Sequence, residues 1–593
     1  MRTSESLRWN PALFAVDDDE LAGSVAGVQA GCAAFTERYR CRLAALSGPE
    51  LGRLLAELGE LRSASLALDS LTALPLAADR AQARWRDRAG QVAGALDDVD
   101  EVLRLVAAEW AAAPASAVAA ALGSPEVEPY RNFLTGIRDT AGFTLAEPVE
   151  TALALREPAA RDAWVDLYDR TMAALRPVVD GRSGTVEQAR SGLESADPAV
   201  RAASLAALYE AVDSAAPVLA HCLDTLVADR VAVADLRGLP GPRAERDLGN
   251  ELSPAVVDDL LAAAEAGYPL AHRWFRRKAE LLGLPRLPAA DLRAPISGLR
   301  PIRYDEAVGL VIGAFEHYLP DTAPVVRELF AGGYVDAEPR PGKYGGAFCR
   351  SRRPGEPPCI LLSYFETFND LTKLAHEVGH AVHFVLAGRR QTPLTFDACD
   401  ALNEVPPALA ELLVADWTIG QEPDPAVRTA MAARRLDTVI EAVFMPTFLT
   451  RFEEAGYGLR AAGGTLTDEG LRELWTEHSG PLYAPAVDLP ARWGLHWPLV
   501  PHLVPEPFAT YPYAFAWLIG LRLRRRLYRD GAGFAARFTD FLGRGGSAPP
   551  LEQLADLGVD PTDPGTWRAG LDEFAELVEP LLAAAPGAGR SQQ

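Results

Sequence analysis

The chain has 593 residues, 49% of them hydrophobic and 23% charged, a composition that excludes an intrinsically disordered protein and allows a large buried core. Its formal net charge of −23, from 58 basic and 81 acidic residues, disfavours nucleic acids and anionic membrane surfaces as partners. The six cysteines contain no CxxC pair, so we expect free thiols and a cytoplasmic location.

The beginning of the chain has no feature of a targeting segment. Residues 1–8 lack the apolar core of a secretory signal and lead into an acidic run at residues 17–20. No uninterrupted apolar stretch of the sequence looks long enough to span a bilayer. We therefore expect a protein without a membrane partner.

Abundant alanine and leucine predict a mainly helical protein. Leucines recur at helical spacing between Leu51 and Leu61, which is typical of an amphipathic helix. A Gly-Arg-Ser-Gly break at residues 181–184 suggests a division into an N-terminal helical region, 1–185, and a catalytic region, 186–585. Helices are predicted within residues 20–110, within 186–235 (including 198–216, with Asp197 as N-cap) and over 254–282.

One region has the pattern of β-structure. Residues 344–350 and 359–364 are short extended runs on either side of a charged, Pro/Gly-containing turn, which predicts a β-hairpin. The hydrophobic period becomes helical from about Asp370. A small sheet is therefore expected directly before the helix that carries the motif described next, within a site core at about 340–515.

The sequence His-Glu-Val-Gly-His at residues 376–380 predicts a metal site. His376 and His380 are four residues apart, so on a helix both imidazoles project from one face and can bind one ion. Glu377 is placed to take a proton from water that zinc activates for attack on a carbonyl. Gly379 allows a second chain segment to approach closely. The alternative is a chance match on an ordinary helix.

A catalytic zinc ion usually has a third protein ligand. The elongated metzincin pattern is excluded, because His383 and Leu386 stand where it requires glycine and histidine. A helix start is predicted near residue 403, with Asn403 as N-cap and prolines in the first turn, which places Glu404 and Glu411 on one face. The carboxylates that remain as candidates are those of Asp397, Asp400, Glu404 and Glu411.

Residues 376–383 followed by 403–411 resemble the thimet oligopeptidase/oligoendopeptidase F family of zinc metallopeptidases, and the oligoendopeptidase F branch fits best. The resemblance implies one zinc ion per chain, with Glu404 as third ligand and Glu411 orienting a zinc histidine. It also implies a multi-helix zincin-type fold with a deep substrate channel. Pro407 is a departure, because the family usually has serine there.

The resemblance continues on both sides of the motif. Residues 340–348 resemble the family's Gly-Lys and Gly-Ala-Phe segment, and residues 501–503 and 507–514 resemble its Pro-His and tyrosine-rich signature. The strand near Ala347 and Phe348 is expected to pair with extended substrate, with Gly345 and Gly346 giving backbone clearance.

Hydrolysis of a peptide creates an oxyanion that a phenol or imidazole donor can stabilise. Tyr511, Tyr513 and His502 are the candidates, although tyrosines in such a segment are often core residues. The resemblance favours Tyr513 as the donor and His502 as a ligand of the oxyanion or the substrate backbone, and Tyr511 is assigned to substrate binding. Ala509 replaces one family tyrosine. We expect a structural role for His383, and His496 is a weak candidate for the active site.

These features predict a zinc-dependent endopeptidase that hydrolyses internal bonds of short oligopeptides, with Glu377 as general base and no obligate protein partner. A carboxypeptidase or dipeptidyl carboxypeptidase would use the same chemistry. A non-catalytic peptide-binding relative is a further alternative, but a binder would have no need for Glu377.

Overall fold

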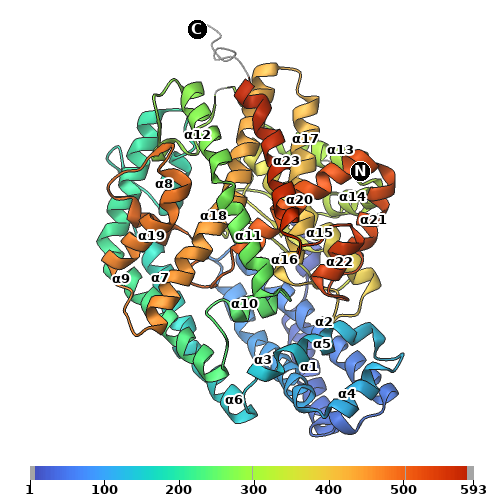
Figure 1. Ribbon diagram of the computed structural model, residues 1–593. Helices are drawn as coiled ribbons and strands as arrows, with labels where there is room; N and C mark the ends of the chain where they lie inside the picture. Colours follow the sequence, from blue (N-terminus) through green and yellow to red (C-terminus); the bar gives the residue numbers. More distant parts are fainter. Residues whose placement is uncertain (1–6, 297, 501, 584–593) are drawn as a thin grey trace. The chain divides into compact units, whose positions relative to one another are not determined.

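The computed structural model describes residues 7–296, 298–500 and 502–583, and helices account for most of the described chain (Figure 1). The predicted mainly helical fold with a small sheet is confirmed. The start of the chain (residues 1–6) and the tail after residue 583, both considered from the sequence, lie outside the described residues.

Contacts divide the chain into two compact units, each assembled from three stretches. The predicted division between residues 185 and 186 does not coincide with a boundary of either unit. Unit 1 consists of Met1–Thr144, Pro301–Thr418 and Leu523–Asp560, and unit 2 of Leu145–Arg300, Ile419–Arg522 and Pro561–Gln593.

Unit 1 begins with three long helices that pack side by side, α1, α2 and α3 (Figure 1). They fulfil the prediction for residues 20–110, and the leucines of α2 from Leu51 to Leu58 are buried against α1 and α3. The helices of unit 1 are α1 (Asp18–Tyr39), α2 (Gly48–Ala78), α3 (Ala83–Ala112), α4 (Ala115–Leu122), α5 (Arg131–Thr140), α13 (Tyr304–Tyr318), α14 (Ala323–Ala331), α15 (Phe368–Arg390), α16 (Asp400–Asn403), most of α17 (Val405–Gln421), the end of α20 (Tyr511–Asp530), α21 (Ala532–Leu542) and α22 (Pro550–Asp556).

A three-stranded sheet precedes α15 in unit 1, in the order β4-β6-β5. The predicted hairpin is confirmed, because β5 (Phe348–Arg350) is antiparallel to β6 (Cys359–Leu361). The third strand, β4 (Val335–Asp336), is parallel to β6 and was not predicted, since two residues are too short for a recognisable pattern. Strand β5 lies at an edge of this sheet and packs against α15.

The segment that leads into β5 is anchored by one buried carboxylate. Both oxygens of Asp336 accept hydrogen bonds from Arg340 at 2.7 Å, and Lys343 lies 2.7 Å from Asp336 Oδ1. Lys343 also donates to the backbone carbonyl of Glu338. Buried charges are stable when paired and hydrogen-bonded in this way, so the Gly-Lys segment seen in the sequence fixes the approach to the edge strand.

Unit 2 contains two long helices, α9 and α18, and each has a proline in its first turn. Asp197 caps α9 as predicted, by accepting from the Ala199 amide at 2.8 Å. The helices of unit 2 are α6 (Glu147–Arg156), α7 (Arg161–Ala174), α8 (Val186–Gly192), α9 (Pro198–Arg237), α10 (Ala244–Gly249), α11 (Pro254–Ala266), α12 (Tyr268–Leu282), α18 (Pro425–Ala461), α19 (Asp468–Tyr483), the start of α20 and α23 (Pro564–Ala583); its short strands are β1 (Val178–Val179), β2 (Arg182–Ser183), β3 (Leu287–Pro288) and β7 (Val487–Asp488).

Residues 254–282 are helical as predicted, but they form two helices, because the chain breaks at Gly267 into α11 and α12. A Cβ atom at Gly267 would lie 2.8 Å from Leu571 Cδ2 and 3.0 Å from Phe444. Pro269, in the first turn of α12, has no amide proton to continue the helix. Close packing and proline together explain the break.

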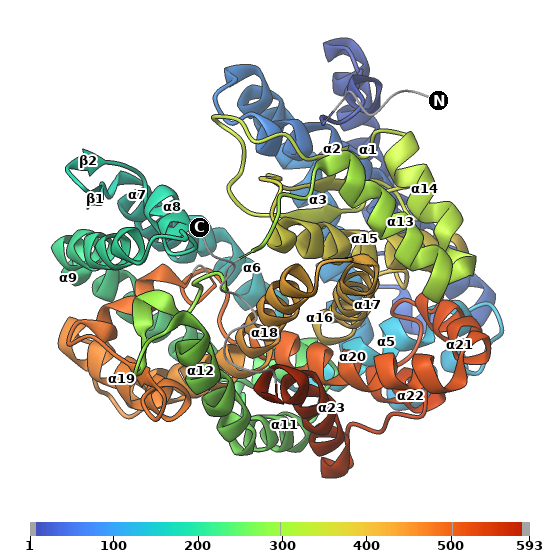
Figure 2. The same ribbon diagram turned by 90° about the horizontal axis from the view of Figure 1, so that it is seen from above.

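Helix α9 contradicts the expectation that no apolar stretch is long enough to span a bilayer. By length and composition it could do so, with a window of mean hydropathy 1.2 that is half buried, and the bent pair α3 and α4 passes the same test together. Within unit 2, α9 packs against α7, α8 and α18 (Figure 2). The core helix of a soluble protein also passes this test.

Candidate metal centre and active site

Helix α15 carries the His-Glu-Val-Gly-His motif and has a defined start. Thr367 and Asp370 form a reciprocal capping box, with the Asp370 amide donating to Thr367 Oγ1 at 3.1 Å and the Thr367 amide donating to Asp370 Oδ2 at 3.1 Å. Capping of this kind satisfies amides that the first helical turn would leave unpaired. The motif therefore lies inside a helix whose first turn is fixed by its own sequence.

Gly379 lets α15 contact α17 directly, as the sequence predicted. A Cβ atom at Gly379 would lie 2.6 Å from Pro407 Cα and 3.1 Å from Ala410 Cβ. Any larger residue would push the two helices apart. This contact sets the spacing between the histidines on α15 and the carboxylates of Glu404 and Glu411.

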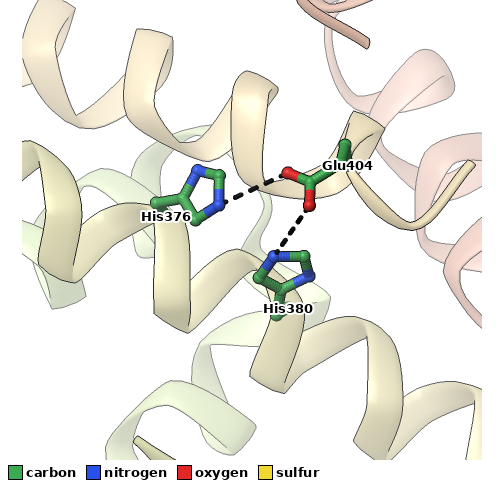
Figure 3. A group of neighbouring side chains, drawn as sticks. All are labelled: His376, His380 and Glu404. Atoms are coloured by element: carbon green, nitrogen blue, oxygen red, sulfur yellow. Dashed lines mark ion pairs between the residues drawn. The ribbon is translucent and has the colours of Figure 1, made fainter. Parts of the chain in front are cut away.

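His376, His380 and Glu404 converge on one point (Figure 3). Nε2 of His376 lies 3.4 Å from Glu404 Oε2, and Nε2 of His380 lies 3.8 Å from Glu404 Oε1. One ligand atom from each residue falls within 4.8 Å of the other two. Two imidazoles and one carboxylate are the donor set of many catalytic zinc sites. These are the three residues predicted as metal ligands.

Glu411 fixes the orientation of His376. Its Oε1 lies 2.8 Å from His376 Nδ1, so Nδ1 donates the hydrogen bond and Nε2 is the ring nitrogen that faces Glu404. Carboxylates in this relation to a metal histidine hold the ring and raise its basicity. Glu411 thus occupies the position expected for a residue that orients a zinc histidine.

The helix start near Glu404 differs from the prediction. Short helix α16 begins at Asp400 with Cys399 as N-cap, so Asn403 ends α16 and is not an N-cap. The side-chain Nδ2 of Asn403 donates instead to Asp397 Oδ1 and to the Ala398 carbonyl, both at 2.8 Å. Glu404 lies at the junction before α17, and the following prolines are in the first turn of α17 as predicted.

The buried polar atoms of this group fit a divalent cation. Within the described residues, Oε2 of Glu377, Oε2 of Glu404 and Nδ1 of His380 are buried without a hydrogen-bond partner. Burial raises the pKa of Glu377 and of Glu404 to about 7. Burial alone would lower the pKa of His376, but its hydrogen bond to Glu411 and the nearby carboxylates raise that pKa to about 10. A cation bound between these residues would stabilise the ionised forms of both carboxyl groups.

His383 lies one turn beyond His380 and is part of the core. It is 1% exposed, and its ring is nearly parallel to those of Phe384 and Phe541. Burial lowers its pKa to about 4, so the ring is neutral at physiological pH. This environment supports the predicted structural role.

The substrate-strand candidates lie at the start of β5. Ala347 and Phe348 are half-buried, and the Phe348 ring packs against a core cluster that includes Trp9. A Cβ atom at Gly345 would meet nothing within 4 Å, whereas one at Gly346 would meet the Tyr344 ring at 2.6 Å. Gly345 therefore lies beside open space, whereas a side chain at Gly346 would displace the exposed Tyr344 ring.

The candidate oxyanion donors belong to unit 2, where His502 and Tyr513 are neighbours. His502 is exposed, Tyr513 is half-buried, and their ring centroids are 6.3 Å apart. Tyr511 differs, because it is fully buried and its hydroxyl accepts from Asn250 Nδ2 at 2.9 Å. Pro501, part of the same sequence signature, lies outside the described residues.

His496 is also in unit 2, in an aromatic cluster. Its Nδ1 lies 3.1 Å from the Tyr209 hydroxyl, and its ring stacks on Trp475 and Trp493. Burial lowers its pKa to about 3. These contacts are typical of a histidine that packs within an apolar region.

The segment that carries His502 and Tyr513 has an anchor that the sequence does not reveal. Glu453 on α18 is 5% exposed and accepts from the Phe508 amide at 2.7 Å, and Phe508 has a left-handed φ of 54°. Arg230 on α9 donates to the Pro505 carbonyl at 2.8 Å. These partners come from distant parts of the chain, so no local pattern could have identified them.

The known proteins that this chain resembles are peptidases. A profile described as Peptidase family M3 matches residues 316–573, and a profile described as Oligopeptidase F matches residues 109–176. The chain is 26% identical over 422 residues to an oligoendopeptidase F homolog of Lactococcus lactis subsp. lactis (strain IL1403), a match that covers 70% of each chain. It is 24% identical over 413 residues to oligopeptidase PepF of Bacillus subtilis (strain 168), covering 68% of this chain and 61% of that protein.

Solved structures show the same fold. The oligoendopeptidase F structure from Enterococcus faecium has a TM-score of 0.72 at 19% identity, covering 95% of this chain and 99% of that chain. A peptidase structure from Chlamydophila abortus has a TM-score of 0.78 at 19% identity, covering 97% of this chain and 98% of that chain.

Proposed function

The chain belongs to peptidase family M3 and is a metallo-oligopeptidase, and on that premise we propose that it is a zinc-dependent endopeptidase of short oligopeptides. One observation carries the proposal: His376, His380 and Glu404 present their donor atoms within 4.8 Å of one another. Glu377 is buried beside them with one carboxylate oxygen that has no hydrogen-bond partner.

The proposed metal ligands are His376 Nε2, His380 Nε2 and a carboxylate oxygen of Glu404, for one zinc ion per chain. Zinc bound there would polarise the peptide carbonyl and make water more acidic. Glu411 holds His376 with Nε2 toward the ion by its 2.8 Å hydrogen bond to Nδ1. Glu377 takes the proton of the attacking water and then delivers it to the departing amine.

We assign oxyanion stabilisation to Tyr513, with His502 as the neighbouring ligand of the oxyanion or the substrate backbone. The contact of their rings, at 6.3 Å between centroids, supports a shared role. The hydroxyl of Tyr511 is already bonded to Asn250 in the interior of unit 2. This supports a structural role for Tyr511 rather than contact with the substrate.

The proposed substrates are short, flexible peptides in the cytoplasm. A peptide in extended conformation would add to the edge of the sheet at β5, where Ala347 and Phe348 lie and where Gly345 leaves open space. The family resemblance further favours a deep channel that admits unstructured peptides and excludes folded proteins.

Zinc-loaded protein should be incubated with a mixed peptide library, prepared once with free and once with amidated carboxyl termini, and the products identified by mass spectrometry. The proposal expects the same internal cuts in both sets, and loss of all cuts after zinc removal by a chelator. Cuts that require a free terminal carboxylate would instead identify a carboxypeptidase or dipeptidyl carboxypeptidase. No cleavage of any peptide by the zinc-loaded protein would identify a binder.

A second digest tests the channel. A short peptide, a reduced unfolded protein and its native form are offered at equal molar amounts. The proposal expects cleavage of the short peptide only. Efficient cleavage of the long unfolded chain would contradict the channel and leave the zinc chemistry unaffected.

A further inference from the structure

Unit 1 contains a pocket of about 530 Å³ beside the metal-binding helix, a volume in the range of small-ligand sites. Its walls come from α2, α3, α5, the end of β5, α15 and the segment after α15. Its apolar lining includes three leucines and three phenylalanines: Leu66, Leu103, Leu394, Phe133, Phe384 and Phe396.

Two contacts connect this pocket to the metal-binding group. The ring of Phe384, which lines the pocket, stacks on the imidazole of His380 with centroids 6.0 Å apart and planes 14° apart. Cys349, in the middle of β5, also lines the pocket, and β5 packs against α15. Burial and the negative charge of Glu377 raise the pKa of the Cys349 thiol. The pocket is therefore bordered by residues in contact with a proposed zinc ligand and by the edge strand.

The charged groups of the pocket have partners. Arg62 lies 4.0 Å from Asp100, and Arg350 is paired with Asp69. Asp397 accepts from the side-chain Nδ2 of Asn403 at 2.8 Å. An occupant with its own charge would have to compete with these pairs, whereas an apolar occupant would not. Aromatic walls favour a large apolar or aromatic side chain.

We infer that this pocket binds one large apolar or aromatic side chain of the peptide substrate, close to the bond that is cut, and so determines specificity. The inference rests on the proposed function. A peptide that adds to the edge of β5 directs alternate side chains to one face of the sheet, and pockets along a sheet edge select among them. The contact of Phe384 with His380 places this pocket next to the reacting centre.

The test uses fluorogenic peptides of one sequence in which a single residue within three positions of the cut is alanine, leucine, phenylalanine, lysine or aspartate. For the position that enters the pocket, phenylalanine should raise kcat/KM by about 10-fold or more over alanine, and neither charged residue should do so. Leu66→Trp fills the pocket and should reduce the phenylalanine-to-alanine ratio at least about 10-fold.

Leu71→Trp is the matched control, because Leu71 is a half-buried leucine of the same helix that lines a different pocket. It should leave the ratio unchanged. Phe133→Ala widens the pocket and should shift the preference from phenylalanine toward tryptophan. Peptide affinity can also be measured with the Glu377→Gln protein, which should cut the peptide far more slowly. Adding Leu66→Trp to this variant should weaken the binding of the phenylalanine peptide only.

An unchanged phenylalanine-to-alanine ratio in both Leu66→Trp and Phe133→Ala, with the alanine peptide still cut, would overturn the inference and leave the proposed function standing. A preference for lysine or aspartate at the affected position would also overturn it. Failure of the wild-type protein to cut any peptide in the series would overturn the proposed function itself, and the inference with it.

Discussion

Nδ1 of His376 lies 2.8 Å from Oε1 of Glu411, and this hydrogen bond joins the two helices that meet at Gly379. The bond occupies Nδ1 and fixes the ring, so the chain itself directs Nε2 at Glu404. The metal-binding geometry is therefore built into the contact between α15 and α17.

This relationship predicts the effect of changing Glu411. Glu411→Ala should weaken zinc binding about 10- to 100-fold, because His376 loses the partner that orients it and raises its basicity. Glu411→Gln keeps an acceptor oxygen and loses only the charge, so its effect should be smaller. Competition with a chromogenic zinc chelator measures both affinities. Wild-type zinc affinity in Glu411→Ala would contradict this role.

The third ligand can be identified by metal content. Purified wild-type protein should contain about one zinc ion per chain, and Glu404→Ala should lose most of it. Asp400→Ala is the control, since Asp400 lies four residues earlier, at the start of α16. Elemental analysis of the dialysed proteins gives the result directly. Full zinc in Glu404→Ala together with loss in Asp400→Ala would reassign the ligand.

The two tyrosines should separate in kinetic measurements. Tyr513→Phe should lower kcat about 10²–10³-fold with little change in KM, because the lost hydroxyl is assigned to the oxyanion. Tyr511→Phe should leave kcat within a few-fold and cost about 1 kcal/mol of stability through the lost hydrogen bond with Asn250. A larger kcat loss in Tyr511→Phe than in Tyr513→Phe would reverse the assignment.

Glu453 should make the stability of the protein depend on pH. Burial raises its pKa from 4.5 to about 8, against the opposing effects of the Phe508 amide, Arg230 and Arg246. Between these values the folded chain holds a proton that the unfolded chain has released. The free energy of unfolding should therefore fall by about 1.4 kcal/mol per pH unit from this group as pH rises, and level off above pH 8.

Glu453→Gln keeps an acceptor for the Phe508 amide and removes the titration. Urea unfolding at pH 5, 6.5 and 8 should show that the variant loses less stability with rising pH than the wild type. Glu473→Gln, at an exposed position of α19, is the control and should follow the wild type. If the free energy of unfolding depends on pH in the same way in the wild type and in Glu453→Gln, the account of a buried, protonated carboxyl group is contradicted.

Much of the proposed metal site could be predicted, because its residues lie close together in the sequence. The spacing of His376 and His380 on one helix is visible in the sequence, and so is the hairpin that precedes it. Glu404 required the family resemblance, since spacing alone left four carboxylates. The helix start at Asp400 was missed because the Asn403 side chain donates back to Asp397 instead of capping α17.

The remaining features depend on packing between distant residues. The break at Gly267 depends on the proximity of Leu571 and Phe444, and the anchor of Phe508 depends on Glu453. The pocket beside His380 is assembled from helices α2, α3 and α5 together with residues near position 390. Periodicity reports which face of one helix is apolar, and not which distant helix will cover it.

The central claim is hydrolysis at a zinc site with Glu377 as the base, and the most direct test is the turnover of zinc-loaded Glu377→Gln protein on a peptide that the wild type cuts. The glutamine should leave zinc content unchanged, because Glu377 is not a ligand. It should lower kcat about 10²–10⁴-fold, because it cannot accept the proton of the attacking water. Turnover near the wild-type rate at full zinc occupancy would contradict the account.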